Sequence, residues 1–170
     1  MILPGAQGAL TYCLNIHPTQ SWAEAKAALT GPVAAVKASI SPEAPFAVGL
    51  RFSAETMGEL NNPEKRAELA EIIRKNDYLP LTMNGFPYGP FHGTRVKEDV
   101  YLPDWRAEER VAYTRDLAEL LAELNPAGAF ISLSTVPGAF RPNGLGAEAE
   151  MAENYIRAAA HLLGGHGAWK

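Results

Sequence analysis

Several features that mark large classes of proteins are absent from this sequence or scarce in it. It has one cysteine, Cys13, in 170 residues, which excludes an internal disulfide and a cysteine-rich metal site. No run of about 18 apolar residues occurs, and the first ten residues lack the basic and apolar regions of a secretion signal. We therefore expect a cytoplasmic protein without a membrane segment.

Positive charge is also scarce. The chain has 15 Lys and Arg residues against 19 Asp and Glu residues, which gives a net charge of -4, so we expect no nucleic-acid partner. The sequence has no Gly-rich phosphate or dinucleotide loop, no Gly-x-Ser-x-Gly and no His-Glu-x-x-His. The sequence therefore disfavours the enzyme classes that depend on those motifs.

The residues that are present predict a single folded α/β domain over positions 1–170. Hydrophobic residues make up 47% of the chain and charged residues 20%, as in an average soluble globular protein. Four times, a short β-type run is followed by a Gly/Pro-rich joint and a helical stretch, which indicates parallel βα units. The expected strands are 10–16, 46–52, 78–84 and 129–135.

The expected strands each have one aliphatic face and one small or polar face. The aliphatic face includes Val48, Leu50 and Phe52, whereas Gly49 and Arg51 alternate with them. A doubly wound sheet needs aliphatic residues on both faces, so this pattern favours a TIM-type barrel. Since eight βα units typically need about 250 residues, the four units predict a half-barrel. The polar residues that we expect at the strand ends are Asn15, His17, Arg51, Asn84 and Ser134.

The richest segment is 84–98, in the long joint after the third expected strand. It holds three aromatic residues together with His92, Arg95 and Lys97, and joints of this length are usually functional or disordered. We expect Tyr88 to help wall a pocket and the two cations to contact a ligand. The alternative interpretation is a rigid, packed loop with solvated charges.

Two histidines are candidates for proton transfer, because imidazole titrates near neutral pH. His17 and His92 fall on separate loops, so they could act as a general acid/base pair or hold a metal. None of the four expected strand ends supplies a carboxylate, and we therefore assign no metal ligand.

The chain resembles a known family in several of these stretches. Residues 10–18, 21–24, 49–53, 132–137 and above all 84–97 are similar to those of the EboE metabolite traffic proteins. These belong to the xylose-isomerase-like superfamily of TIM barrels, the sugar-phosphate isomerases and epimerases. The resemblance runs from about Leu10 to Leu163 and implies the N-terminal half of such a barrel. It associates the chain with gene clusters that move or mature a secondary metabolite.

The resemblance also implies that the site is incomplete in this chain. Relatives bind a divalent metal through Glu, Asp and His residues, mainly on later strands, so Mg²⁺, Mn²⁺ or Zn²⁺ is expected only in a longer form. The cofactor is otherwise unknown. The open edges of a half-barrel further predict pairing with another chain, such as a homodimer.

The sequence thus leads to one main hypothesis and two alternatives. The main hypothesis is a half-barrel that binds or isomerises a small polar metabolite at its strand ends. There Arg51 would bind an anionic group, while Asn15 and Asn84 would bind hydroxyls. The alternatives are a metabolite carrier without catalysis and a truncated chain without function.

Overall fold

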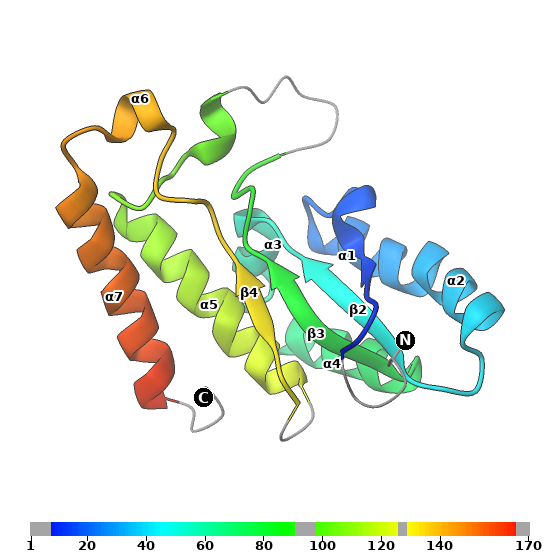
Figure 1. Ribbon diagram of the computed structural model, residues 1–170. Coiled ribbons are helices and arrows are strands. Elements are labelled where there is room, and N and C mark those ends of the chain that lie inside the picture. The colour runs from blue at the N-terminus through cyan, green and yellow to red at the C-terminus, as the bar shows by residue number, and fades with distance from the viewer. Residues whose placement is uncertain (1–7, 91–97, 126–128, 166–170) are drawn as a thin grey trace.

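The computed structural model describes residues 8–90, 98–125 and 129–165, with side chains as far as His161. It is a mixed α/β structure (Figure 1). The strands are β1 (Tyr12–Cys13), β2 (Phe46–Arg51), β3 (Tyr78–Asn84) and β4 (Ser132–Ser134). The α-helices are α1 (Trp22–Thr30), α2 (Pro32–Ile40), α3 (Ala54–Glu59), α4 (Pro63–Lys75), α5 (Glu108–Leu124), α6 (Arg141–Gly144) and α7 (Glu148–Gly165). The 3₁₀ helices are η2 (Leu14–Ile16) and η3 (Glu98–Tyr101).

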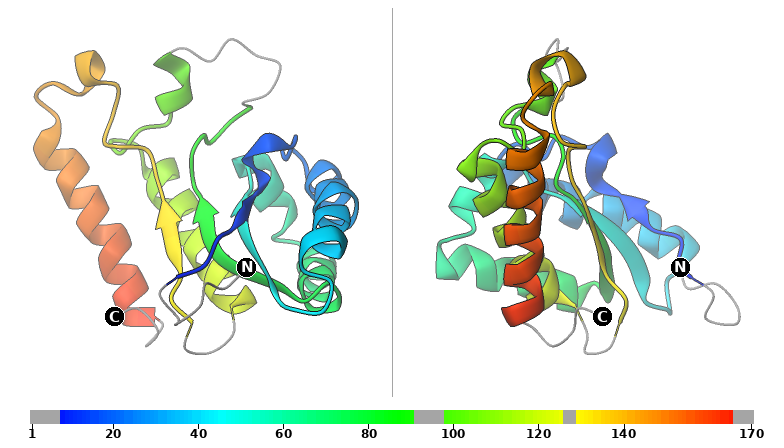
Figure 2. Two further views of the ribbon diagram at one scale, coloured as in Figure 1. Left: turned by 45° about the vertical axis from the view of Figure 1, so that its right-hand side comes forward. Right: turned by 60° about the vertical axis from the view of Figure 1, so that its left-hand side comes forward.

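The four strands form one parallel sheet in the order β1-β2-β3-β4. This confirms the predicted α/β class with four βα units, and the arrangement is compatible with half of a TIM-type barrel. Helices α4, α5 and α7 lie on one side of the sheet (Figure 2). Cys13, Ser132 and Ser134 are exposed, so parts of β1 and β4 face solvent. In the described part of the chain, no helix is both long and apolar enough to cross a bilayer.

Local capping signals in the sequence set several helix boundaries. The Ser-x-x-Glu pattern at Ser21 and Glu24 predicts a capping box, and the structure has that box at the start of α1. Ser53 caps α3 through its hydroxyl, and the Asn62 side chain accepts two backbone N–H bonds at the start of α4, with Pro63 at the first position. These expectations are confirmed because each depends on residues within one turn.

The two edge strands are shorter than expected. The first was predicted over 10–16, but only Tyr12–Cys13 is a strand, and the chain then turns into η2, where His17 N–H donates to Leu14 O at 2.9 Å. The fourth was predicted over 129–135 and covers Ser132–Ser134. An edge strand has a ladder on one side only, so fewer hydrogen bonds hold its ends. The inner strands fit better, since β3 matches 78–84 and β2 ends one residue early.

One irregularity corrects the face assignment of β3. The parallel register pairs Ala47 with Leu79 and Val48 with Pro80, then Gly49 with Thr82, so an extra residue, Leu81, interrupts the alternation. Strict alternation along 78–84 predicts that Leu79 and Met83 share a face. In the structure Leu79 instead shares the face of Ala47, and Met83 that of Leu50.

The start of α5 also differs from the prediction. Asp104 is of a residue type that commonly caps helices and precedes the predicted apolar stripe, so the sequence predicts a cap there. The N-cap is instead Ala107, which provides no side-chain cap. The Asp104 carboxylate instead accepts hydrogen bonds from the backbone and guanidinium of Arg106. An arginine two positions along the chain has therefore replaced the helix terminus as the partner of this carboxylate.

Two apolar clusters hold the fold together. The larger lies between the sheet and its helices and includes Leu50, Phe52 and Leu117, each fully buried. Burying one such side chain contributes roughly 1.5–3 kcal/mol. The smaller cluster packs the loops after β3 and β4 against each other. In it, Trp105 stacks on Tyr155 with ring centroids 3.9 Å apart and donates from Nε1 to Val136 O at 2.9 Å.

Two buried tyrosines predict a loss of stability in alkali. Burial raises the pKa of Tyr78 and of Tyr113 from the ordinary 10.0 to about 12. Their hydroxyls donate to Leu29 O and Phe52 O. The pKa of each tyrosine is higher in the folded state than in the unfolded state. Their contribution to the free energy of unfolding is therefore complete below pH 10 and is lost as the pH rises towards 12. Urea unfolding across this range should show a steep fall in stability, and a Tyr78→Phe variant should show a flatter one. An equal slope in both proteins would contradict the assignment.

Candidate functional site

The carboxyl ends of β3 and β4 bring two of the predicted site residues together. Ser134 Oγ donates to Asn84 Oδ1 at 2.8 Å, and Phe86 N–H donates to the same oxygen at 3.2 Å. One step earlier along the strands, Ser132 Oγ donates to Thr82 Oγ1 at 3.0 Å. Hydroxyl and amide groups therefore form two rows across this pair of strands. Ser134 is exposed and Asn84 is half-buried, so this polar pair is open to a ligand.

Strand β1 and the residues that follow it form a second polar group at the same end of the sheet. Tyr12 and His17 join through Tyr12 Oη and His17 Nε2, 2.8 Å apart, and their rings stack with centroids at 5.8 Å. Either group can be the donor, depending on the imidazole tautomer. Asn15 lies in η2, not on a strand, and its Oδ1 is buried without a hydrogen-bond partner.

Arg51 is at the end of β2, as predicted, but its guanidinium is occupied by the protein itself. The side chain is 2% exposed. Nη1 donates to the carbonyl and hydroxyl of Thr19, and Nη2 donates to the carbonyls of Pro87 and Gly89. Burial lowers the pKa of Arg51, and the neighbouring Tyr113 opposes that shift. Its observed role is to join the loop after β1 to the loop after β3, while the anion-binding role stays a prediction.

Tyr88 lies in the same loop and packs into the interior. Its ring meets that of Tyr113 edge to face, with centroids 4.9 Å apart, and its carbonyl accepts the N–H of Ala54 at 2.9 Å. The ring is half-buried and contacts the main apolar cluster. The remaining predicted residues of this joint, His92, Arg95 and Lys97, lie outside the described residues.

Arg110 is a prominent residue at this end of the sheet that the sequence prediction missed. It is fully buried in the first turn of α5 and donates to Gly85 O and Pro103 O, both at 2.8 Å. A signal was present in the sequence, because Arg110 continues the apolar stripe of Thr114, Leu117 and Leu121 one turn towards the N-terminus. An arginine in the buried phase of a helix indicates a specific partner, and here the partners are loop carbonyls.

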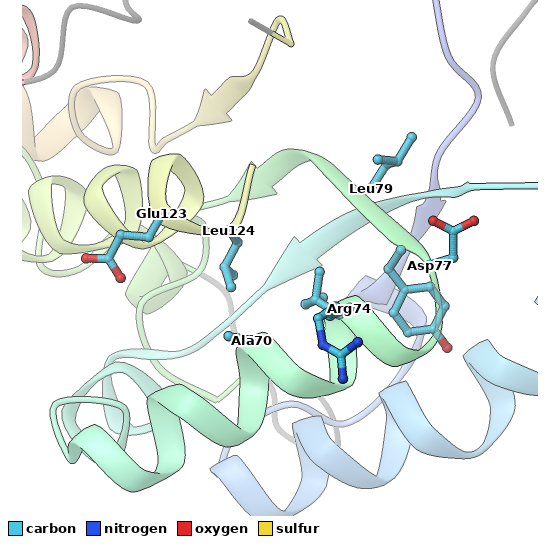
Figure 3. A pocket seen from close by; sticks show the side chains of 8 residues that line it. Ala70, Arg74, Asp77, Leu79, Glu123 and Leu124 are labelled. Carbon is cyan, nitrogen blue, oxygen red and sulfur yellow. The ribbon is translucent and has the colours of Figure 1, made fainter. Parts of the chain in front are cut away.

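One hollow in the described structure lies away from the predicted site residues. It has a volume of about 320 Å³ and lies where α4 and α5 meet the start of β3 (Figure 3). Its lining includes Arg74, Asp77 and Glu123 and none of the predicted site residues. Arg74 is already paired with Glu71. This hollow is at the amino end of β3, whereas sites in parallel α/β proteins lie at the carboxyl ends of strands.

The described side chains at the carboxyl ends of the strands do not fit a divalent metal. Within residues 8–90, 98–125 and 129–165, no three His, Cys, Asp or Glu side chains come together as a metal site requires. We therefore derive no chemical step through a metal.

Comparisons with known proteins do not identify a relative. No family model matches the chain, and no curated protein or solved structure matches it. The expected membership in the EboE family therefore stays a prediction from the sequence stretches.

Proposed function

We propose that the chain is a half-barrel of the xylose-isomerase-like, EboE type that binds a small polar metabolite at the carboxyl ends of its strands. The observation that supports this most directly is the Ser134–Asn84 pair. It joins neighbouring strands at the edge where parallel α/β proteins bind ligands, and its serine is exposed.

The hydrogen-bond pattern of this pair favours a hydroxylated ligand. Asn84 Oδ1 already accepts two bonds, which leaves the Nδ2 hydrogens to donate. Ser134 Oγ uses its hydrogen on Asn84, which leaves its lone pairs to accept. A ligand hydroxyl both accepts and donates, so it can satisfy the two groups together. His17, which is joined to Tyr12 at the same end of the sheet, is the proposed acid/base group if the metabolite is isomerised.

A carrier without catalysis is the second candidate. The observation in its favour is that the described residues assemble no metal site of the kind used by the sugar isomerases that the chain resembles. Binding without turnover would favour the carrier, whereas isomerisation of a bound sugar would favour the enzyme.

Ser134→Ala tests the proposed site. We expect saturation-transfer NMR against a panel of monosaccharides and polyols to detect binding to the unchanged chain. Loss of one hydrogen bond of about 1.4 kcal/mol should weaken that binding about tenfold in the variant. Ser39→Ala, at an exposed position of α2, is the matched control and should leave binding unchanged. Absence of binding by every panel member, or equal affinities in the two variants, would contradict the proposal.

We also propose that a second copy of the chain completes the sheet. All four strands run parallel with β1 and β4 at the edges, so a two-fold axis along the strands places β1 of one copy beside β4 of the other. The contact forms at both edges and brings eight strands together, the number that closes a barrel with a packed interior. Phe130, just before β4, is 84% exposed and would be covered by this pairing.

Light scattering tests the dimer. We expect a mass of twice 18.3 kDa for the unchanged chain and a monomer for Phe130→Asp, because a charge at the new interface opposes pairing. Leu102→Asp, at an exposed site between β3 and α5, should remain dimeric because it lies on neither edge strand. A monomer with cooperative thermal unfolding would refute the dimer. An aggregating chain with non-cooperative unfolding would favour the alternative of a truncation without function.

A further inference from the structure

The Arg110 side chain occupies an unusual environment for a guanidinium. It is 0% exposed, and its central carbon lies 5.6 Å from the ring centre of Tyr88 and 5.4 Å from that of Tyr113. Nε donates to Pro103 O and Nη1 to Gly85 O, so two of its three nitrogens have carbonyl partners. The third nitrogen, Nη2, is buried and has no hydrogen-bond partner. It is therefore a charged donor that the described fold leaves unused.

The positive charge here is not neutralised by a carboxylate. Neither Arg110 nor Arg51 forms an ion pair with any described residue. The nearby Asp104 carboxylate is held by Arg106 at 2.6 Å. Arg51 and Arg110 both bind carbonyls of the same loop, between Gly85 and Gly89, so two buried cations lie beneath it. Burying a guanidinium without an anion is costly, and an anionic ligand would offset that cost.

The start of α5 adds to the positive field around Arg110. The backbone N–H groups of the first turn carry a partial positive charge, and no side chain caps this 17-residue helix. The acidic residues of that turn, Glu108 and Glu109, are exposed, and Glu108 is paired with Arg157. These carboxylates lie in solvent, which screens their repulsion of an anion. The attraction between the anion and the buried guanidinium is screened less.

We propose that Arg110 Nη2 is the binding group for one oxyanion, a phosphate or a carboxylate, at the carboxyl end of β3. The oxyanion would accept from Nη2 and neutralise the buried pair of cations. It would reach the guanidinium past Tyr88, whose ring is only partly buried, whereas the Tyr113 ring on the other side is buried. This inference goes beyond the proposed function, since inorganic phosphate alone tests it.

The experiment is a titration of the whole chain with inorganic phosphate at constant ionic strength, followed by thermal unfolding and by the ¹⁵N side-chain resonances of arginine. We expect phosphate to raise the melting temperature and to shift the Arg110 resonance. Arg110→Lys should raise the apparent Kd at least tenfold, because lysine lacks the planar fork that leaves Nη2 free. Arg157→Lys, at an exposed ion pair, is the matched control and should bind as the unchanged chain does.

A second titration, with acetate in place of phosphate, distinguishes a carboxylate ligand from a phosphate ligand. The ion that binds more tightly identifies which of the two groups the site prefers. The proposal is overturned if phosphate leaves both the melting temperature and the Arg110 resonance unchanged. It is also overturned if Arg110→Lys and Arg157→Lys bind phosphate equally, because the ion then binds to general positive charge. The resonance is measured on the unchanged chain, so the test stands even if a variant does not fold.

Discussion

Arg51→Ala is expected to lower the free energy of unfolding by about 3 kcal/mol, because it removes the guanidinium donor from the carbonyls of Pro87 and Gly89 and one of the two side-chain donors to Thr19 O. The guanidinium bonds the backbone oxygens of Thr19, Pro87 and Gly89 at 3.3, 3.2 and 2.8 Å. These oxygens come from two loops that are far apart in the sequence, so losing the side chain also separates the loops. Arg51→Lys should recover only part of the loss, since an ammonium cannot span both sets of acceptors.

Urea unfolding and amide hydrogen exchange measure this effect. The N–H of Ala54 donates to Tyr88 O in the loop that Arg51 holds, so its exchange should accelerate in the alanine variant. Arg157→Ala is the comparison, because an exposed ion pair contributes about 0–1 kcal/mol. If the two alanine variants were equally stable, Arg51 would not be the structural link that its contacts indicate.

The same result bears on how ligand binding by Arg51 variants is interpreted. If the Arg51 side chain holds the Pro87 and Gly89 carbonyls, its removal displaces the loop after β3. This displacement occurs whether or not the ligand contacts Arg51. A loss of affinity in Arg51→Ala would then not identify Arg51 as a contact residue. Ser134 is a better probe of direct contact, because it is exposed and its hydroxyl bonds to the neighbouring strand at Asn84.

Features that depend on neighbouring residues were predictable from the sequence. The caps at Ser21, Ser53 and Asn62 use side chains and N–H groups within three positions of each other, so the pattern of residues determines them. The parallel order of strands followed from alternating β-type and helical runs. The position of Asn84 and Ser134 at one edge followed as well, because the carboxyl ends of parallel strands meet there.

Features set by distant residues were not predictable in this way. The alternation of β3 could not reveal the extra residue at Leu81, which appears only when β2 and β3 are paired. The residue type placed Arg51 correctly at the end of β2 but gave no sign that its acceptors lie 32 to 38 positions away. Arg110 was missed for the same reason, since its carbonyl partners include Gly85, 25 positions earlier.

Gly85→Ala is expected to cost about 2 kcal/mol and to disturb the proposed metabolite site. An added Cβ would lie 2.8 Å from Ser134 O and 3.0 Å from Leu117 Cδ1. The backbone N–H of Gly85 donates to that same Ser134 oxygen at 2.9 Å, so the clash falls on the link between the ends of β3 and β4. Overpacking of this kind costs about 1–3 kcal/mol, more than the roughly 0.4–1 kcal/mol that alanine returns by restricting the unfolded chain.

Gly89→Ala is the matched control within the same loop, because a Cβ there meets no atom within 4 Å. It should change the free energy of unfolding in urea by less than about 0.5 kcal/mol. If Gly85→Ala were as stable as Gly89→Ala, the close approach of Gly85 to Ser134 would not limit the structure. A destabilised Gly85→Ala that also lost metabolite binding, beside a Gly89→Ala that retained it, would connect the β3–β4 link to the site. The glycine is then required because the strand ends must approach closely enough for Ser134 to reach Asn84.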